Sequence, residues 1–247
     1  MDAYWNAALR LRAGGTLYAP GLPTDSDLYR YAPWFAFAWI PLTFLPKGAV
    51  LLGWMAICLG AAFASVAPLL WRGWVGVALF ALLLPFQLGG AAFGNVQPIL
   101  VMLLMWGVGR RSGPAWIAIA ASLKATPILL AAVYVGRGEW RRAGVAIFLT
   151  AVLVVPMLSF DLRGYSTAIG GGQSLLLVSP FIWLPATLAG VGAALWLART
   201  RYGWLAGTVA MIVALPRFLL YEIGFVLVGL ARDKPGPAPK RQPTPAR

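Results

Sequence analysis

The chemistry open to this chain is limited by its few ionisable side chains. It contains no histidine, so any acid–base chemistry must come from a carboxylate. The sequence holds seven such groups, namely Asp2, Asp25, Asp27, Glu139, Asp161, Glu222 and Asp233. A second set consists of two bases inside long apolar stretches, Lys124 and Arg217, which have the charge needed to hold an anion.

Lys124 lies in the middle of the apolar stretch 113–136, "GPAWIAIAASLKATPILLAAVYVG". A charge at the centre of a membrane helix costs about 2.5–3.5 kcal/mol on insertion scales. Pro127 follows three residues later and predicts a break in the helix. Broken helices are tolerated at membrane depth where the backbone faces protein or a wet cavity. We therefore expect Lys124 to face a cavity that receives an anion; the alternative is a buried partner for a backbone carbonyl or for Glu222.

Other polar side chains at the breaks, or on the same side of the membrane, are candidates for a substrate cavity, since polar groups are rare in such a chain. For Asn95 and Gln97 the alternative is helix capping and interhelical hydrogen bonding. For Glu222 it is a simple pairing with Arg217. The full set is Tyr31, Gln87, Asn95, Gln97, Gln173 and Glu222.

Metal and disulfide chemistry find little support. The "DSD" of Asp25–Asp27 is similar to the metal-binding pair of nucleotide-sugar transferases, but an Asp-rich turn is better interpreted as a solvated loop. We assign no metal ligands and expect no cofactor, leaving a divalent metal open. Because Cys58 is the single cysteine, no intramolecular disulfide forms.

Composition places the chain in a membrane. It is 60% hydrophobic and 11% charged, with a mean hydropathy of +0.78, whereas a soluble domain carries about 25% charged residues. Several continuous apolar runs approach or exceed the ~20 residues that cross hydrocarbon, and they lack the alternation of a membrane β-barrel. The net charge is +13, but the bases lie at the ends of apolar runs rather than in a nucleic-acid-binding stripe. The sequence predicts an all-α polytopic membrane protein with no nucleic-acid partner.

The elements expected along the chain form a membrane-embedded unit, 1–231, and a disordered, basic, Pro-rich tail, 232–247. Residues 1–47 should form an outer-face region: a short interfacial helix at 1–13, a loop, and a Pro-broken apolar segment at 31–46 lying at the surface. Residues 48–231 should form the transmembrane bundle. Clear spans are expected at 48–71, 73–92, 95–109, 142–159 and 175–198, and broken segments at 113–136 and 203–231.

Charge fixes the expected topology. If Arg72 is cytosolic and the spans alternate, Arg110 and Arg111 are cytosolic too. Two further basic clusters are also cytosolic if each broken segment enters the membrane and returns as two half-helices. They are Arg137, Arg141 and Arg142 after 113–136, and Arg199 and Arg201 before 203–231. A single kinked crossing of 113–136 is the alternative, because its length also fits one span.

Four local patterns together resemble glycosyltransferase family 87, the polyprenol-phosphate-mannose-dependent α-mannosyltransferase-like family also called domain of unknown function 2029. "DAYWNAALRLRAGGTLY" is similar to the opening Asp-x-x-x-Tyr…Ala-Gly-Gly-x-x-Tyr. "YRYAPWFAFAWIPLTFLP" is similar to Tyr-x-Tyr-Pro-Pro…Leu-Pro. The stretch from "FGNVQP" through "SLKATP" to "GRGEWRRA" is similar to Gly-Gln-x-Asn…Leu-Lys-x-x-Pro…Arg-x-Trp-Arg. "GGGQSLL" is similar to Asn-Gln-Ser-Leu, and "LPRFLLYE" adds a weaker similarity.

The resemblance implies a C-type glycosyltransferase-like helical bundle with broken or re-entrant helices. Such an enzyme transfers a hexose, here mannose, from a polyprenyl-phosphate-sugar donor to a lipid or glycan acceptor at the outer face of the plasma (inner) membrane. Asp2 takes the position of the family's general base, acting in an inverting transfer. Lys124 and Arg217 are the cations available for the departing phosphate. No nucleotide-binding Gly-rich loop occurs, which agrees with a lipid donor.

Three departures from the family pattern bear on activity. Ala32 replaces the first Pro of Pro-Pro, and Asn95 and Gln97 exchange the usual Gln and Asn. The sequence also begins at the Asp, without the family's first transmembrane helix. If that helix is absent from the protein, the alternative is a non-catalytic polyprenyl-phosphate-binding or transport protein; an in-frame hydrophobic segment upstream of Met1 would favour the enzyme.

Overall fold

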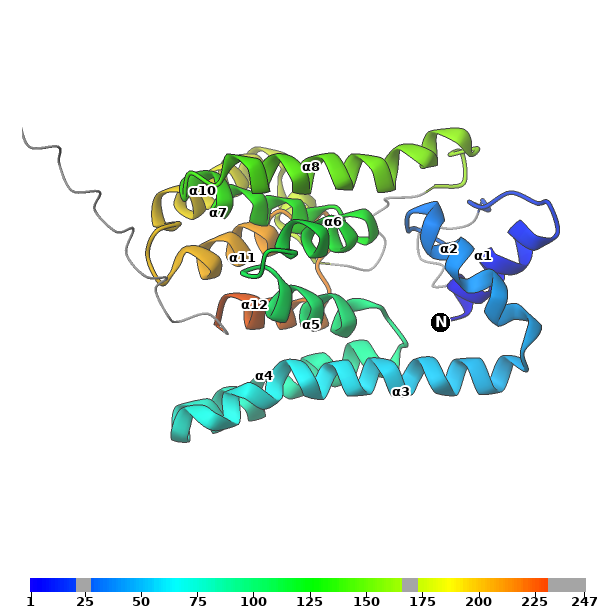
Figure 1. Ribbon diagram of the computed structural model, residues 1–247, viewed down its shortest axis with the longest axis horizontal. Coiled ribbons are helices and arrows are strands. Elements are labelled where there is room, and N and C mark those ends of the chain that lie inside the picture. The colour runs from blue at the N-terminus through cyan, green and yellow to red at the C-terminus, as the bar shows by residue number, and fades with distance from the viewer. Residues whose placement is uncertain (21–27, 166–172, 231–247) are drawn as a thin grey trace, which may run out of the picture.

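The computed structural model describes residues 1–20, 28–165 and 173–230. Within these ranges the chain is helical, with one isolated antiparallel bridge between Gln173 and Phe218 in place of any strand. The expected all-α class is confirmed. Figure 1 shows the long helices running roughly parallel to one another, with α1 and α2 gathered at one end.

Three runs are long and apolar enough to cross a membrane: Lys47–Ala92, Trp140–Ser159 and Pro180–Leu197. The first folds back at Gly73, whose φ of +66° favours glycine. It therefore gives two antiparallel helices of 20 residues each, α3 (Lys47–Val66) and α4 (Gly73–Ala92), joined by the 3-10 turn η2 (Ala67–Arg72). At 1.5 Å per residue each reaches about 30 Å, the thickness of the hydrocarbon core.

The other expected spans differ from single continuous helices of full length. The region 142–159 is α8 (Trp140–Val154) continued by η4 (Val155–Ser159). The region 175–198 is interrupted, since α9 (Leu175–Val178) ends before α10 (Pro180–Leu197). Ser179 between them is extended because a residue that precedes proline is disfavoured in the α conformation. The region 95–109 holds an 11-residue helix, α5 (Gln97–Gly107), which at about 16 Å is shorter than a span.

The stretch 113–136 is broken at Lys124, as its sequence predicts. Helix α6 (Gly113–Leu123) ends there, Lys124 is extended, and the chain continues as η3 (Thr126–Leu130) and α7 (Ala131–Gly136). The Tyr134 hydroxyl at the end of α7 donates a hydrogen bond to the carbonyl of Val108, just before α6 begins. The two ends of the stretch therefore lie together, which is the geometry of two half-helices rather than of one kinked crossing.

A second broken hairpin covers 203–230. Helix α11 (Gly203–Val213) is followed by a non-helical segment, then by η5 (Leu220–Phe225) and α12 (Val226–Leu230). Gly229 packs so closely on Leu205 that a Cβ at this glycine would lie 2.5 Å from the Leu205 Cα. Helix α12 thus returns beside the start of α11. Pro216 in the connecting segment explains why a continuous helix does not form.

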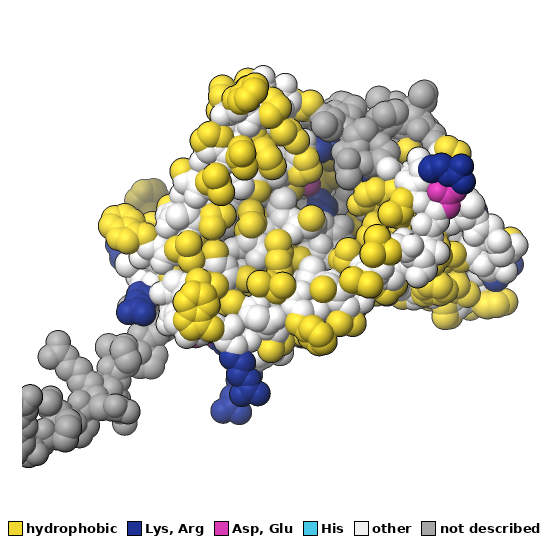
Figure 2. All heavy atoms as spheres, turned by 90° about the horizontal axis from the view of Figure 1, so that it is seen from above, with side chains coloured by type: hydrophobic (Ala, Val, Ile, Leu, Met, Phe, Trp, Pro, Cys, Tyr) yellow, Lys and Arg dark blue, Asp and Glu magenta, His cyan; other side chains and the backbone are white. Residues whose placement is uncertain are grey.

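The loops with most of the described bases lie at one end of the bundle. Arg137 donates from Nε to the Ala198 carbonyl at 2.7 Å, and Arg199 donates to the Gly136 carbonyl at 3.2 Å. Arg142 Nη2 lies 2.5 Å from the Arg110 carbonyl, and Arg72 Nη1 lies 2.6 Å from the Leu230 carbonyl. In Figure 2, hydrophobic side chains are spread over most of the face shown. Lys and Arg side chains are few; most lie at its margins, and some lie beside an acidic side chain in a hollow near its middle.

The opposite end is covered by the N-terminal region. Helix α1 (Asp2–Arg12) packs against α2 (Pro33–Trp39), which continues into η1 (Ile40–Phe44). At 12 residues, Pro33–Phe44 is too short for a span, as expected of a surface segment. Tyr4 is at the centre of an aromatic cluster with ring centroids 5.1–5.9 Å apart, whose other members are Tyr31, Phe35, Trp39 and Trp54.

Labelling with a membrane-impermeant thiol reagent tests the first hairpin. Ser112 and Arg141 are exposed and flank the two half-helices. Ser112→Cys and Arg141→Cys, each in a Cys58→Ser background, should react from the same side of intact cells or inverted vesicles, and that side should be the cytosol. Labelling of the two positions from opposite sides would contradict the hairpin and require a single kinked span.

Candidate functional site

The site is centred on an ion pair between the two broken hairpins. Lys124 Nζ lies 2.8 Å from Glu222 Oε1, and the two side chains are 14% and 5% exposed. The residues are 98 positions apart in sequence. Each lies where a helix is interrupted, Lys124 at the end of α6 and Glu222 in η5. Of the alternatives for these residues, the structure shows Lys124 with Glu222, whereas Glu222 does not pair with Arg217.

Tyr221 and Asn95 extend the ion pair toward the loop between α4 and α5. The Lys124 ammonium lies 5.2 Å from the centre of the Tyr221 ring, within cation–π range. The Tyr221 hydroxyl accepts a hydrogen bond from Asn95 Nδ2 at 3.0 Å. Asn95 Oδ1 in turn accepts from the Gln97 backbone N–H at 2.9 Å, which satisfies a free donor at the start of α5. Asn95 therefore satisfies a backbone donor at the start of α5 and also joins the site.

Two buried glutamines lie on the helices that contact η5. Gln87 and Gln97 are 1% and 0% exposed, and neither side-chain amide has a hydrogen-bond partner among the described residues. Gln87 lies against Gly224, where an added Cβ would meet its Nε2 at 1.9 Å. An amide without a partner in such surroundings is costly, roughly 1–3 kcal/mol. Both amides therefore retain donors and acceptors that a water or a ligand hydroxyl would satisfy.

Tyr31 connects the site to the N-terminal cover, the region made of α1, α2 and η1. Its hydroxyl accepts from the Tyr4 hydroxyl at 3.3 Å, and the same Tyr4 oxygen accepts from the Val96 backbone N–H at 3.3 Å. Burial raises the pKa of Tyr31 above its ordinary value, and the positive charge of Lys124 acts in the opposite direction. Trp34 Nε1 donates to Ser122 Oγ at 3.0 Å, two residues before Lys124. The cover is thus held onto the end of α6.

Asp2 lies at the same end of the bundle but outside this cluster. Its Oδ1 is 2.7 Å from Lys47 Nζ, and both side chains are about half exposed, at 48% and 47%. The hydrogen bond from Lys47 lowers the pKa of Asp2, although partial burial opposes the shift. The neighbouring Met1 side chain packs against Gly94, directly before Asn95. Asp2 is therefore linked to the loop between α4 and α5 through its neighbour Met1. Asp2 pairs with Lys47 and does not contact Lys124 directly.

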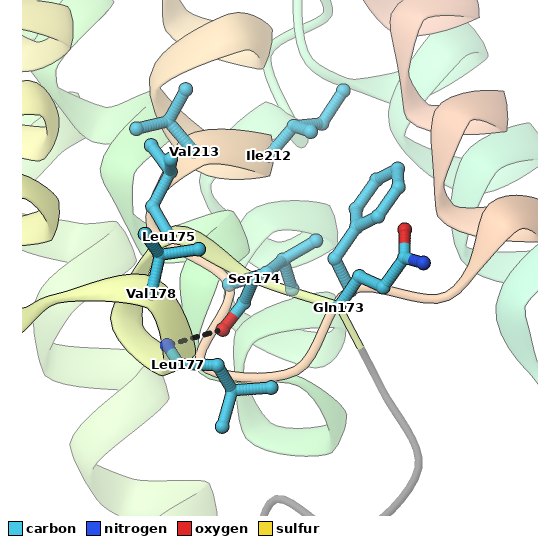
Figure 3. A pocket seen from close by; sticks show the side chains of 9 residues that line it. Gln173, Ser174, Leu175, Leu177, Val178, Ile212 and Val213 are labelled. Atoms are coloured by element: carbon cyan, nitrogen blue, oxygen red, sulfur yellow. Dashed lines mark hydrogen bonds between the residues drawn. The ribbon is translucent and has the colours of Figure 1, made fainter.

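Gln173 lines an apolar pocket of about 570 Å³, and Arg217 directly precedes Phe218, another of the lining residues. The pocket lies between the α9 region and the end of α11, and Figure 3 shows Leu175, Ile212 and Val213 turned toward the same space. Gln173 lines it and pairs through its backbone with Phe218, while Ser174 Oγ donates to the Pro216 carbonyl at 2.8 Å. In the sequence, Arg217 lies between Pro216 and Phe218, the two residues held by these contacts. In the described part of the chain it forms no ion pair, and its buried Nε has no acceptor.

The structure thus places most of the predicted residues at one end of the bundle, where they form three separate groups. Lys124, Glu222 and Asn95 form one connected cluster. Gln173 lines the pocket, Arg217 precedes the lining residue Phe218, and Asp2 pairs with Lys47. Sequence reasoning missed Tyr221 and Lys47. Tyr221 could have been found as the neighbour of Glu222 in a break. Lys47 could have been found as a base on the side of the membrane where few are expected.

Two predictions fall outside the described residues: the "DSD" turn at Asp25 and Asp27, and the tail at 232–247. In the ranges that the structure describes, no group of three or more His, Cys, Asp or Glu side chains could hold a metal ion.

Comparison with known proteins identifies the family. The sequence model of glycosyltransferase family 87 matches residues 29–169, more than half of the chain. No curated protein matches, and no solved structure does. The matched range contains Lys124, Asn95 and the first broken hairpin, in agreement with the motifs found in the sequence. The chain therefore belongs to glycosyltransferase family 87 and is a membrane glycosyltransferase.

Proposed function

We propose that the protein transfers a hexose, mannose, from a polyprenyl-phosphate-sugar donor to a lipid or glycan acceptor at the extracytoplasmic face of the plasma membrane. The observation that carries the proposal is Lys124, a cation at a helix break between apolar half-helices, on the side away from most of the described bases. A phosphate there would meet a positive charge in low dielectric, where electrostatic stabilisation of a leaving group is large.

The reaction assigned to the site is an inverting displacement. Asp2 accepts the proton of an acceptor hydroxyl, whose oxygen forms a bond to the anomeric carbon of the sugar. The bond between that carbon and the phosphate oxygen breaks, and the polyprenyl phosphate leaves with the electron pair. Lys124 and Arg217 stabilise the charge on the phosphate. Lys47 keeps Asp2 ionised and hence able to accept the proton.

The remaining site residues are assigned to the sugar and its surroundings. Gln87 and Gln97 offer amide groups with no other hydrogen-bond partner among the described residues. Tyr31 and Asn95 supply further polar atoms near Lys124, and Glu222 is the partner of Lys124 in the free protein. A site of this kind discriminates among hydroxylated substrates, since a substrate without the matching hydroxyl leaves these buried groups unpaired.

A lipid-linked donor is supported by the pocket beside Arg217. Its lining is mainly Leu, Val, Ile and Phe, and its volume of about 570 Å³ is in the range of small-ligand pockets. Val178, at its margin, is 74% exposed and would face the bilayer. An amphiphile with a hydrocarbon chain in the pocket would have its charged group near Arg217. Gln173 provides a polar atom at the same boundary.

The orientation follows from the positive-inside rule. Arg137, Arg142 and Arg199 contact backbone carbonyls at one end of the bundle, while α1 and Lys124 lie toward the other. Cytoplasmic loops carry an excess of Lys and Arg. The end with Asp2 is therefore the extracytoplasmic one in this proposal.

The second candidate is a non-catalytic protein that binds or transports polyprenyl phosphate. It is favoured by Asp2, which pairs with Lys47 and does not contact the cluster around Lys124. A transporter would be expected to show internal repeats, and we find none in the sequence. This candidate predicts lipid binding without transfer.

A donor comparison tests the proposal. Membranes with the full-length protein should transfer radiolabelled mannose from polyprenyl-phosphate-mannose to a lipid extract, and should not transfer it from a nucleotide-linked mannose. Membranes from the same host without the protein are the control. Transfer from the nucleotide donor alone would contradict the proposal, and binding of the lipid donor with no transfer would favour the second candidate.

A further inference from the structure

Glu222 occupies a position that an anionic ligand of Lys124 would take. Its Oε1 lies 2.8 Å from the Lys124 ammonium, and the carboxylate side chain is 5% exposed. A second anion in the same place would be repelled by this charge, and the repulsion is strong where water is scarce. A phosphate would therefore bind Lys124 more favourably if Glu222 moved away.

We propose that Glu222 is an internal stand-in for the donor phosphate, which displaces its carboxylate from Lys124 on binding. This inference rests on the proposed function, because it assumes that the ligand of Lys124 is a phosphate. In the free protein the carboxylate neutralises a cation that would otherwise be buried and unpaired, a strongly destabilising state. In the bound protein the phosphate takes over that role.

The surroundings of Glu222 allow such an exchange. Its second oxygen, Oε2, accepts from the Leu219 backbone N–H at 3.2 Å, a bond independent of Lys124. The residue lies in η5, a 3-10 helix of six residues that follows the non-helical segment 214–219, so no long helix has to be disrupted when it moves. The Tyr221 ring, 5.2 Å from the ammonium, remains a contact for Lys124.

The exchange also explains how the site would select its ligand. An uncharged isoprenoid alcohol cannot replace a carboxylate next to an ammonium, whereas a phosphate offers a stronger set of charged acceptors. The internal carboxylate thus lowers the affinity for every ligand and rejects neutral ones. Removing its charge should strengthen the binding of an anion.

The test is equilibrium binding of farnesyl monophosphate to the full-length protein in nanodiscs, with farnesol and inorganic phosphate as comparison probes. Glu222→Gln keeps the size and an acceptor for the Leu219 N–H but removes the charge. Farnesyl monophosphate should bind this variant about tenfold more tightly than wild type, and farnesol should gain nothing. Glu139→Gln is the matched control, since it breaks the Glu139–Arg142 pair, 2.6 Å long, at the other end of the bundle. It should leave the affinity unchanged.

Unchanged or weaker binding by folded Glu222→Gln would overturn the inference. If this variant fails to fold, Glu222→Asp takes its place, because a shorter carboxylate pairs less closely with Lys124; affinity should then rise about threefold, and no rise overturns the inference. Lys124→Met separates the two proposals. If it binds farnesyl monophosphate as wild type does, the phosphate site of the proposed function fails. If it binds weakly while Glu222→Gln gains nothing, the stand-in role alone fails.

Discussion

Asp2→Asn should lower the rate of sugar transfer by about 10²–10⁴-fold, the contribution of a positioned general base. Asparagine keeps the size and can still accept a hydrogen bond from Lys47, but it cannot take up a proton. Expression and membrane insertion should therefore be unaffected. The measurement is transfer of radiolabelled mannose from polyprenyl-phosphate-mannose in membranes with matched amounts of each protein.

Asp161→Asn is the matched control for this variant. Asp161 is an exposed carboxylate with its own ion pair, to Arg163 at 3.0 Å, and no role in the proposed site. It should transfer sugar at the wild-type rate. If Asp2→Asn keeps most of its activity, Asp2 is not the base.

The pH dependence of transfer is a second test of Asp2 as the general base. Because Lys47 lowers the pKa of Asp2, the carboxylate is ionised at neutral pH and is protonated only as the pH falls through this lowered pKa. Activity should be lost in that acid range. Lys47→Met should move the acid limb of the profile to higher pH, whereas a purely structural pair would leave its position unchanged.

Lys124→Met should destabilise the protein by about 3–5 kcal/mol, since it leaves the buried Glu222 carboxylate without its partner. Donor binding should weaken by about 1.5–3 kcal/mol, the typical contribution of a charged hydrogen bond. From the sequence alone, removal of a central charge is expected to ease insertion. The ion pair in the structure makes loss of stability the larger effect.

A double variant separates the two losses. Lys124→Met combined with Glu222→Gln removes both charges, so its thermal unfolding temperature in detergent should return toward that of wild type. Its affinity for farnesyl monophosphate should stay low. Recovery of both stability and affinity would contradict a phosphate role for Lys124. Lys124→Arg need not restore binding, because a planar guanidinium does not fit every site built for a compact ammonium.

The breaks in the helices could be predicted because their causes are local. Pro127 and Pro216 remove helix hydrogen bonds and restrict the residue before them, and both stretches are broken where expected. Pro180 acts in the same way on Ser179, and the interruption there divides the span expected at 175–198. The short α5 was not predicted, because an apolar run does not reveal where a turn such as the one after Gly107 will end the helix.

The composition of the site was predictable to a lesser degree. Lys124 and Glu222 stand out because charges are rare in an apolar chain, but their pairing depends on how two hairpins 98 residues apart pack together. Sequence reasoning therefore left several partners open for each. The pairing of Asp2 with Lys47 depends in the same way on how α1 lies against the start of α3. Tyr221 is marked in the sequence only as the neighbour of Glu222 in a break, and its role follows from its contact with Lys124.

In the proposed function, Lys124 holds the phosphate of a lipid-linked donor. The most direct measurement is a cryo-electron microscopy map of the full-length protein in nanodiscs with farnesyl monophosphate. Phosphate density should lie within hydrogen-bond distance of Lys124 Nζ, with Glu222 turned away and the isoprenoid chain toward the pocket beside Arg217. Phosphate density at the arginines of the opposite end, with the Lys124–Glu222 pair intact, would contradict the account.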